Sequence, residues 1–339
     1  MFAHTVDAVD SAHVRQGRRG LFIATFAFLA VFAASAVPIP LYSEYKATIG
    51  LTDADISATM LMYLFGVILT LFFSGSLSDA AGRKPLAAVS LLLAMLGCFM
   101  FLRATDPMVV LAARAVQGVS CGLAMSAISA LVVDSAVGRY TGFGLAVAGC
   151  GALLGVMAGS LAVGFLSLAT SYHAVIYWIM IALLALGVVL VPAAPETVVR
   201  RAPLRSACKP VISVDPKLRR VLPVAGCAYV ASWGVGTFFQ SFSSPVAVEC
   251  FGSSDPFVAL FGLSTGMCLS GSLRLLFAQA DARSTATVVS TINLIGYAGS
   301  AVLSGVMGAL VGVTTLVGVL AVLAACAAGA AVVVFARTR

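Results

Sequence analysis

Long apolar runs of about twenty residues, separated by short polar breaks, fill most of this chain. The runs are continuous rather than alternating, which is typical of membrane-spanning helices and not of the strands of a membrane barrel. We therefore expect an all-α polytopic membrane protein. The pattern predicts ten transmembrane helices, at residues 20–42, 57–77, 86–104, 108–132, 142–168, 172–193, 220–241, 257–277, 286–310 and 313–335.

The longest polar connection divides these helices into a group of six and a group of four. The first apolar run follows RQGRRG, as in a signal peptide, but it is too long and too many spans follow, so we expect an uncleaved first span. The expected organisation is a cytoplasmic tail at 1–19, a six-helix bundle at 20–193, a cytoplasmic central loop at 194–219, and a shortened four-helix bundle with a short tail at 220–339.

Composition and charge agree with a membrane chain. Of the 339 residues, 61% are hydrophobic and only 10% are charged, too few to cover a soluble surface. The net charge is +7, and 17 of the 20 Lys and Arg residues lie on one side; the exceptions are Lys46 and Arg103 on the other side and Arg114 inside a helix. Because positive loops stay cytoplasmic, we expect both termini in the cytoplasm, a multi-pass chain in the cell (inner or plasma) membrane, and no nucleic-acid partner.

Enzymatic chemistry finds little support in the sequence. The eight Cys residues show no CxxC and no metal-site spacing, so we interpret them as small packing residues. The chain has no phosphate-binding loop of the kind with which ATP-hydrolysing proteins bind the nucleotide. We expect a protein that is not an enzyme and that holds no metal and no cofactor.

An internal repeat links the two groups of helices. Residues 118–126 (GVSCGLAMS) and 262–270 (GLSTGMCLS) share Gly, Ser, Gly and Ser at an offset of 144 residues, and the same offset aligns Arg139 with Arg283. Chance is the alternative, because small residues recur at packed helix interfaces. The repeat predicts that the second half lacks counterparts of the second and third helices.

The connection between the second and third helices reads GSLSDAAGRKP, residues 75–85. A basic inner loop explains Arg83 and Lys84 but neither Asp79 nor the glycines. The stretch resembles the loop motif of the major facilitator superfamily, in which Asp follows Gly by four residues and Gly-Arg-Lys comes next. The matching residues are Gly75, Asp79, Gly82, Arg83 and Lys84. The resemblance implies a two-bundle fold, here six helices plus four, that binds substrate between the halves and works by alternating access.

The chemistry of this loop suggests a conformational latch. Gly75 and Gly82 permit close approach and tight turning of the backbone. Asp79 is suited to the positive start of a facing helix, which the resemblance places in the ninth span. Arg83 needs an acidic partner, and Asp134 at the cytoplasmic end of the fourth span is the expected one.

The fourth helix contains RAVQGVSCG, in which Arg114, Gln117 and Gly118 resemble the second motif of the same superfamily. An Arg within a span costs about 2.5–3.5 kcal/mol on insertion scales, so a function is expected. The alternative is an Arg that snorkels to the outer interface. The resemblance implies a part in proton or substrate coupling.

The fifth helix is similar to the antiporter motif of the superfamily only in part. It has Val156 where the family has Pro, and Ser160 in place of the last Gly. Ordinary packing of small residues is the alternative. The glycines that follow the motif are Gly142, Gly151, Gly155 and Gly159.

Aromatic and amide residues supply the candidates for a central cavity, with a belt at the lipid surface as the alternative for the aromatics. They are Tyr63, Trp233, Phe238, Phe239, Gln240 and Asn293. Such a lining suits a hydrophobic or amphipathic solute. No carboxylate lies at the middle of a span, so the sequence does not reveal a proton site.

The expected function is secondary active transport of a small solute, resembling the bacterial drug and metabolite efflux branch, with proton-coupled antiport. Its partners are then a small-molecule substrate, protons and the lipid bilayer, and a homodimer is one way to close the gap in the second half. Two alternatives stay open: a folded but inactive deletion remnant of such a transporter, and an importer of small nutrients.

Overall fold

The computed structural model describes residues 2–169, 174–198, 295–299, 301–302, 305–306 and 318. All regular structure in these ranges is helical, which confirms the expected all-α class. The bounds are α1 Phe2–Ala36, α2 Tyr42–Ile49, α3 Asp53–Ala81, α4 Arg83–Leu102, α5 Pro107–Leu123, α6 Ser129–Ser135, α7 Thr141–Ala169 and α8 Ala174–Leu190, with the short turns η1 Ala124–Ile128, η2 Gly138–Tyr140 and η3 Val191–Ala193.

Six stretches of the described residues are long and apolar enough to cross a membrane. They correspond to the first six expected helices, and they are Arg15–Ala36, Ala54–Phe73, Arg83–Leu102, Pro107–Ser135, Gly138–Leu166 and Ala174–Ala193. The four helices expected after residue 220 lie outside the described residues, apart from short pieces of the last two.

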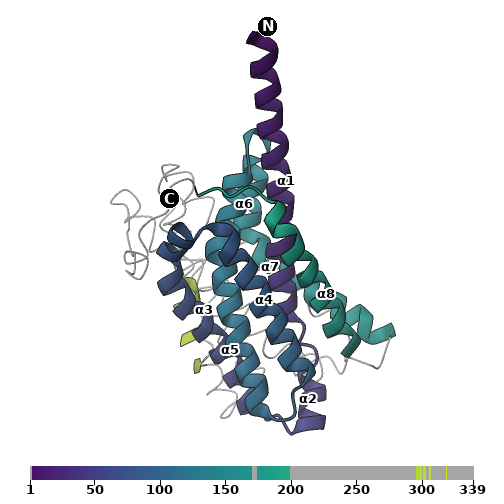
Figure 1. Ribbon diagram of the computed structural model, residues 1–339. Helices are drawn as coiled ribbons and strands as arrows, with labels where there is room; N and C mark the ends of the chain where they lie inside the picture. Colours follow the sequence, from purple (N-terminus) through teal and green to yellow (C-terminus); the bar gives the residue numbers. More distant parts are fainter. Residues whose placement is uncertain are drawn as a thin grey trace.

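The first helix is longer than the sequence predicted. It begins at Phe2, so residues 2–19, expected as a tail, continue directly into the first span. Figure 1 shows this part of α1 projecting beyond the other helices, at the end of the bundle opposite to α2. The described turn at residues 37–41 ends α1 before residue 42, and α2 follows it.

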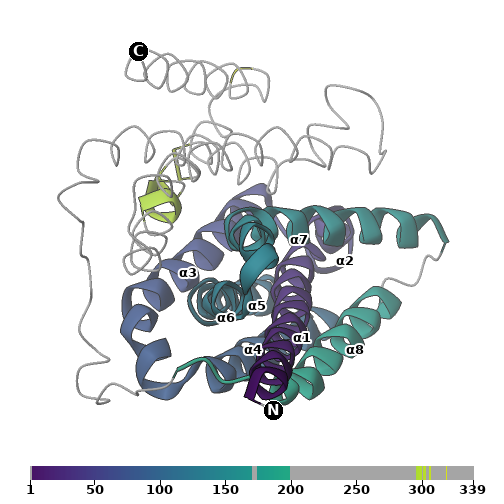
Figure 2. The ribbon, with the colours of Figure 1, turned by 90° about the horizontal axis from the view of Figure 1, so that it is seen from above.

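The helices pack in a bundle whose centre is α5. It lies between α3 and α4, while α1 packs against α7, α6 and α8. The view from above shows α5 and α6 between α3 and α1 (Figure 2). Because the membrane-length helices are apolar and their backbone groups bond within each helix, the bundle satisfies the requirement of a lipid solvent.

Local signals in the sequence explain where α5 begins. Asp106 caps the helix by accepting hydrogen bonds from the backbone N–H of Met108 (2.9 Å) and of Val109 (3.2 Å). Pro107 occupies the first helical position, where its missing N–H costs nothing. The same span continues through a π-helical turn, η1, into α6, so that the expected fourth helix is one membrane-length stretch with a local widening.

Candidate functional site

A one-residue turn joins α3 to α4. Its residue, Gly82, has φ of +98° and ψ of 152°, a conformation that residues with a side chain rarely adopt. A Cβ at this position would also lie 3.1 Å from Glu196 Oε2. The glycine that the sequence singled out for tight turning therefore occupies a position that requires it.

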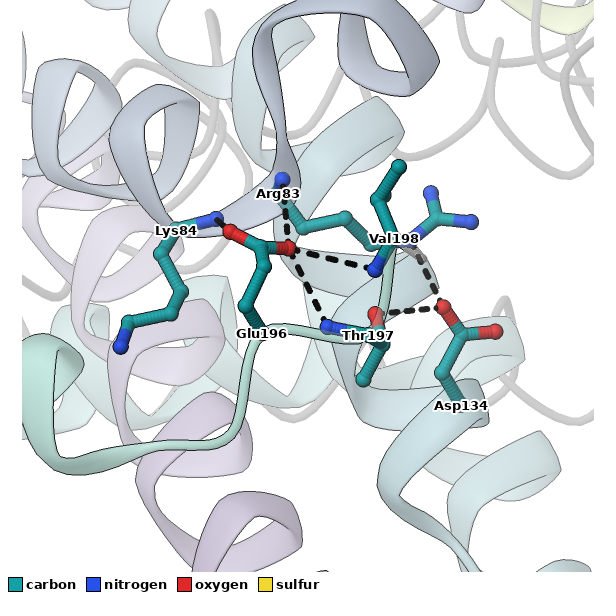
Figure 3. A network of polar contacts seen from close by, with 6 residues as sticks. All are labelled: Arg83, Lys84, Asp134, Glu196, Thr197 and Val198. Atoms are coloured by element: carbon teal, nitrogen blue, oxygen red, sulfur yellow. Dashed lines mark hydrogen bonds and ion pairs between the residues drawn. The ribbon is translucent and has the colours of Figure 1, made fainter. Parts of the chain in front are cut away.

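The next residue, Arg83, is the first of α4 and pairs with the end of α6. Its Nε lies 2.7 Å from Asp134 Oδ2, the partner that the sequence suggested (Figure 3). The same carboxylate oxygen accepts a hydrogen bond of 2.8 Å from the Thr197 hydroxyl. Two helices and the segment after α8 thus meet at one carboxylate.

Glu196 is a member of this site that the sequence did not reveal. Its Oε1 accepts a hydrogen bond from the backbone N–H of Arg83 (3.1 Å), and its Oε2 accepts one from that of Lys84 (3.3 Å). Oε1 also accepts from the backbone N–H of Thr197 at 3.1 Å. The first N–H groups of a helix need acceptors and favour negative charge, so the carboxylate supplies what Gly82, with no side chain, cannot.

The segment that carries Glu196 crosses the ends of α4 and α6. We call residues 192–198 the strap. Besides the Glu196 and Thr197 contacts, the Lys84 Nζ donates a hydrogen bond of 2.7 Å to the Pro192 carbonyl oxygen. Figure 3 shows Glu196 and Thr197 of the strap next to Arg83, Lys84 and Asp134, with Val198 at its end. A signal for the strap was present in the sequence: α4 begins without a Ser, Thr, Asp or Asn cap, and a carboxylate lies close to the end of α8.

The remaining residues of the expected latch are placed only by their backbone. Gly75 and Asp79 lie in the last turns of α3. The start of the ninth span, which was expected to face Asp79, lies outside the described residues. The pairing of Asp79 with that helix therefore stays a prediction.

A second polar cluster surrounds Arg114 inside the bundle. Arg114 is 4% exposed. Its Nη1 donates hydrogen bonds to the Ser35 carbonyl oxygen (2.7 Å) and to Gln117 Oε1 (3.1 Å), and its Nε donates to the Tyr42 hydroxyl (2.6 Å). The guanidinium is held by buried groups of α1, α2 and α5, so the snorkelling alternative is wrong for this residue.

Three aromatic rings enclose the same guanidinium. The Arg114 Cζ lies 5.4 Å from the ring centre of Tyr42, 5.9 Å from that of Tyr63 and 5.8 Å from that of Phe101. These distances are in the range of cation–π attraction, which partly offsets the cost of burying the charge. Tyr63, expected in a cavity wall, is 4% exposed and packs here against Arg114.

The other two residues of the second motif hold helices together. Gln117 is buried and donates a hydrogen bond of 3.1 Å from Nε2 to the Ala34 carbonyl oxygen of α1. Gly118 faces the backbone of Tyr63 so closely that a Cβ would lie 2.9 Å from the Tyr63 carbonyl carbon. Motif residues of α5 therefore contact both α1 and α3.

Glycines of α7 form the contact with α1. A Cβ at Gly155 would lie 2.7 Å from Phe32 Cβ, and one at Gly159 would lie 2.7 Å from the Ala33 Cα. A Cβ at Gly151 would meet the Phe28 ring at 3.0 Å, whereas one at Gly142 would meet nothing within 4 Å. The packing interpretation of these glycines accounts for three of the four.

The end of the bundle where α2 lies has a further contact that the sequence did not reveal. The Tyr45 hydroxyl lies 2.8 Å from that of Tyr177 and donates to the Phe101 carbonyl oxygen at 3.2 Å. Burial raises the pKa of Tyr45, so its hydroxyl stays protonated and available for these bonds. Through Tyr45, α2 is tied to α4 and α8.

The other cavity candidates, Trp233, Phe238, Phe239, Gln240 and Asn293, lie outside the described residues. Within the described part of the chain, no group of three or more His, Cys, Asp or Glu side chains is arranged to hold a metal ion.

Comparison with known proteins identifies the family. A model of the Major Facilitator Superfamily matches residues 21–339. The quinolone resistance protein NorA of Staphylococcus aureus is 25% identical over 114 residues, which are 34% of this chain and 29% of NorA. The multidrug resistance protein MdtL of Shewanella sp. (strain ANA-3) is 36% identical over 87 residues, 26% of this chain and 22% of MdtL. The aligned segments thus span less than a third of these relatives.

Solved structures show the same fold. The human organic anion transporter MFSD10 (TETRAN) superimposes with a TM-score of 0.62 at 17% identity, over 95% of this chain and 99% of that one. A single-site mutant of the nucleoside transporter NupG gives a TM-score of 0.65 at 12% identity, over 95% of this chain and 100% of that one. The family model and the named relatives, rather than these distant structures, point to a transport function and not to an enzymatic one. The chain belongs to the Major Facilitator Superfamily.

Proposed function

We propose that this chain is a secondary active transporter that moves a small hydrophobic or amphipathic solute across the cell membrane by alternating access, in the direction of efflux. The observation that carries the proposal is the family match over nearly the whole chain. The local similarity to NorA and MdtL, a quinolone and a multidrug resistance protein by name, supports efflux. A multi-pass arrangement with both termini cytoplasmic follows the distribution of Lys and Arg along the sequence.

The network at the start of α4 is the proposed latch of the cytoplasmic side. Its members include Arg83, Asp134 and Glu196, whose contacts join α4, α6 and the strap. Gly75, Asp79, Gly82 and Lys84 complete it by their place in the loop motif. An equilibrium between two conformations is shifted by a few kcal/mol, which is the scale that several such contacts supply together.

The cluster around Arg114 is the proposed coupling site, with Gln117 and Gly118. Its buried charge contacts α1, α2, α3 and α4 from α5, so a change of pairing there is transmitted to their packing. We propose that protons are the coupling ions. Gly142, Gly151, Gly155 and Gly159 are the antiporter-like residues of α7, three of which are in contact with α1.

The second half is expected to be shortened, and this raises an alternative to an active transporter. A chain that lacks counterparts of two helices forms a complete pathway as a homodimer, or else it is an inactive remnant. Import of a small nutrient is the alternative to efflux as the direction of transport. A transport assay with purified protein distinguishes all three.

The test is transport in proteoliposomes that contain the purified full-length chain and an imposed pH gradient, with a panel of drug-like, metabolite and nutrient compounds. We expect accumulation of an amphipathic compound against its gradient, driven by protons and lost in Arg114→Ala. Asp79→Asn should lower the rate while the protein elutes as a folded species. Full activity of Asp79→Asn would contradict the latch. A folded protein that transports no compound and gives no cross-linked dimer would favour the remnant.

A further inference from the structure

The guanidinium of Arg114 presents two edges with different partners. Nη1 is bound by two carbonyl-type oxygens, Ser35 O at 2.7 Å and Gln117 Oε1 at 3.1 Å, which hold the group in place. Nε donates to one neutral hydroxyl, that of Tyr42, at 2.6 Å. Nη2 makes no hydrogen bond to any residue that the structure describes. One edge is therefore anchored, and the other is only half used.

The part of the chain that the structure describes supplies no negative charge to this buried cation. Arg114 forms no ion pair there, and its hydrogen-bond acceptors are all neutral. The helices expected at 220–241, 257–277, 286–310 and 313–335 contain no Asp and no Glu. A buried charge is normally paired with an opposite charge, because leaving it alone is costly. The cluster is therefore suited to an anion that comes from outside the chain.

The half-used edge has the geometry that recognises an oxyanion. Nε–H and Nη2–H of an arginine point in nearly parallel directions and bind the two oxygens of a carboxylate together. The Tyr42 hydroxyl occupies half of this fork. Tyr42 comes from α2, an eight-residue helix at one end of the bundle, and its hydroxyl has a second partner, Thr59 Oγ1, at 3.0 Å. The hydroxyl can leave Arg114 and keep that bond.

We infer that the substrate is an amphipathic organic anion whose single oxyanion group, such as a carboxylate, takes the Nε–Nη2 edge of Arg114 in place of the Tyr42 hydroxyl. Tyr42 is then a placeholder that satisfies Nε while the site is empty. The rings of Tyr42, Tyr63 and Phe101 have centres 5.4–5.9 Å from the guanidinium and favour an apolar, aromatic body next to the charge. This inference rests on the proposed transport function and specifies its substrate class.

The test compares three molecules with the same ring: 1-naphthoate, the uncharged 1-naphthamide, and 1-naphthyltrimethylammonium. Binding to the purified full-length chain is measured by equilibrium dialysis with radiolabelled probe, and transport is measured separately in proteoliposomes. We expect 1-naphthoate to bind at least about 10-fold more tightly than the amide, the effect of one hydrogen bond to a charged group. The cationic analogue should not bind.

Variants separate the anion site from a structural role. Arg114→Gln should weaken 1-naphthoate binding about 10- to 100-fold. Arg114→Lys keeps the charge but loses the fork, so it should bind with intermediate affinity. Tyr42→Phe should bind 1-naphthoate more tightly, because no hydroxyl has to be displaced. Arg103→Gln, at an exposed position, is the matched control and should bind as the original chain does.

The outcomes distinguish this inference from the proposed function. Binding of 1-naphthoate that depends on Arg114, without transport, supports the anion site and counts against the transport proposal. Transport of the amide or of the cationic analogue, without 1-naphthoate binding, leaves transport intact and overturns the anion site. Equal binding of 1-naphthoate by Arg114→Gln, or weaker binding by Tyr42→Phe, also overturns it.

Discussion

Arg83 Nε and Asp134 Oδ2 lie 2.7 Å apart, so the first residue of α4 is paired with the penultimate residue of α6. The side chains are 13% and 34% exposed, respectively. Partial exposure to water limits the value of such a pair to about 1 kcal/mol or less. The pair is therefore weak enough to break during a conformational change, and its partners can be tested singly.

Asp134→Asn should lower the free energy of unfolding by about 1 kcal/mol or less, because it removes the charge that faces Arg83. A double-mutant cycle with Arg83→Gln, measured by thermal unfolding in detergent, should give a coupling energy of about 0.5 kcal/mol or more. The cycle of Asp134→Asn with Arg139→Gln is the control, since the described contacts of Arg139 are with Tyr140. Additivity in the first cycle would contradict a direct interaction.

The carboxylate of Glu196 should stabilise α4 in two ways, as an acceptor and as a charge. Glu196→Gln keeps an acceptor and should cost about 0.3–1 kcal/mol through the lost charge at the helix N-terminus. Glu196→Ala removes the acceptor too and should cost about 1–2 kcal/mol, as for other lost caps. High salt should narrow the difference between the original chain and Glu196→Gln. Equal melting temperatures for Glu196→Gln and Glu196→Ala would show that the hydrogen bonds of Glu196 contribute nothing to stability.

Gly82→Ala should destabilise the chain by about 1–3 kcal/mol, because φ of +98° with ψ of 152° suits glycine alone. Gly142→Ala is the matched control: it lies in α7, and a Cβ there meets nothing within 4 Å. That variant should be as stable as the original chain or slightly more stable, since Ala favours helix. If Gly82→Ala and Gly142→Ala have the same melting temperature, the turn at Gly82 has another conformation.

Gly159→Ala tests whether the glycines of α7 serve packing. A Cβ at Gly159 would lie 2.7 Å from the Ala33 Cα, so α1 and α7 must separate. We expect a loss of about 1–3 kcal/mol in thermal stability, typical of overpacking, again with Gly142→Ala as reference. Unchanged stability together with lost transport would favour the antiporter interpretation over packing.

Much of the architecture was predictable from the sequence because lipid imposes a simple rule. A helix that crosses the bilayer must be a continuous apolar stretch of about twenty residues, and six of these were recognised where the structure describes them. The start of the first helix was not, since residues 2–19 include many polar positions and their hydropathy does not distinguish helix from tail. The pairing of Arg83 with Asp134 was also predictable, because both residues lie at helix ends on the side rich in Lys and Arg.

The sequence by itself determined the class of protein, its first six spans and the family motif, because these depend on local composition and short spacings. Only the tertiary structure decided which distant residues meet. Glu196 is 113 positions from Arg83, and Tyr42 is 72 positions from Arg114. Such pairs depend on how helices rotate and cross when they pack, and small residues such as Gly118 and Gly155 set these approaches. Hydropathy describes the tendency of a residue to leave water, and it does not specify which residues of other helices become its neighbours.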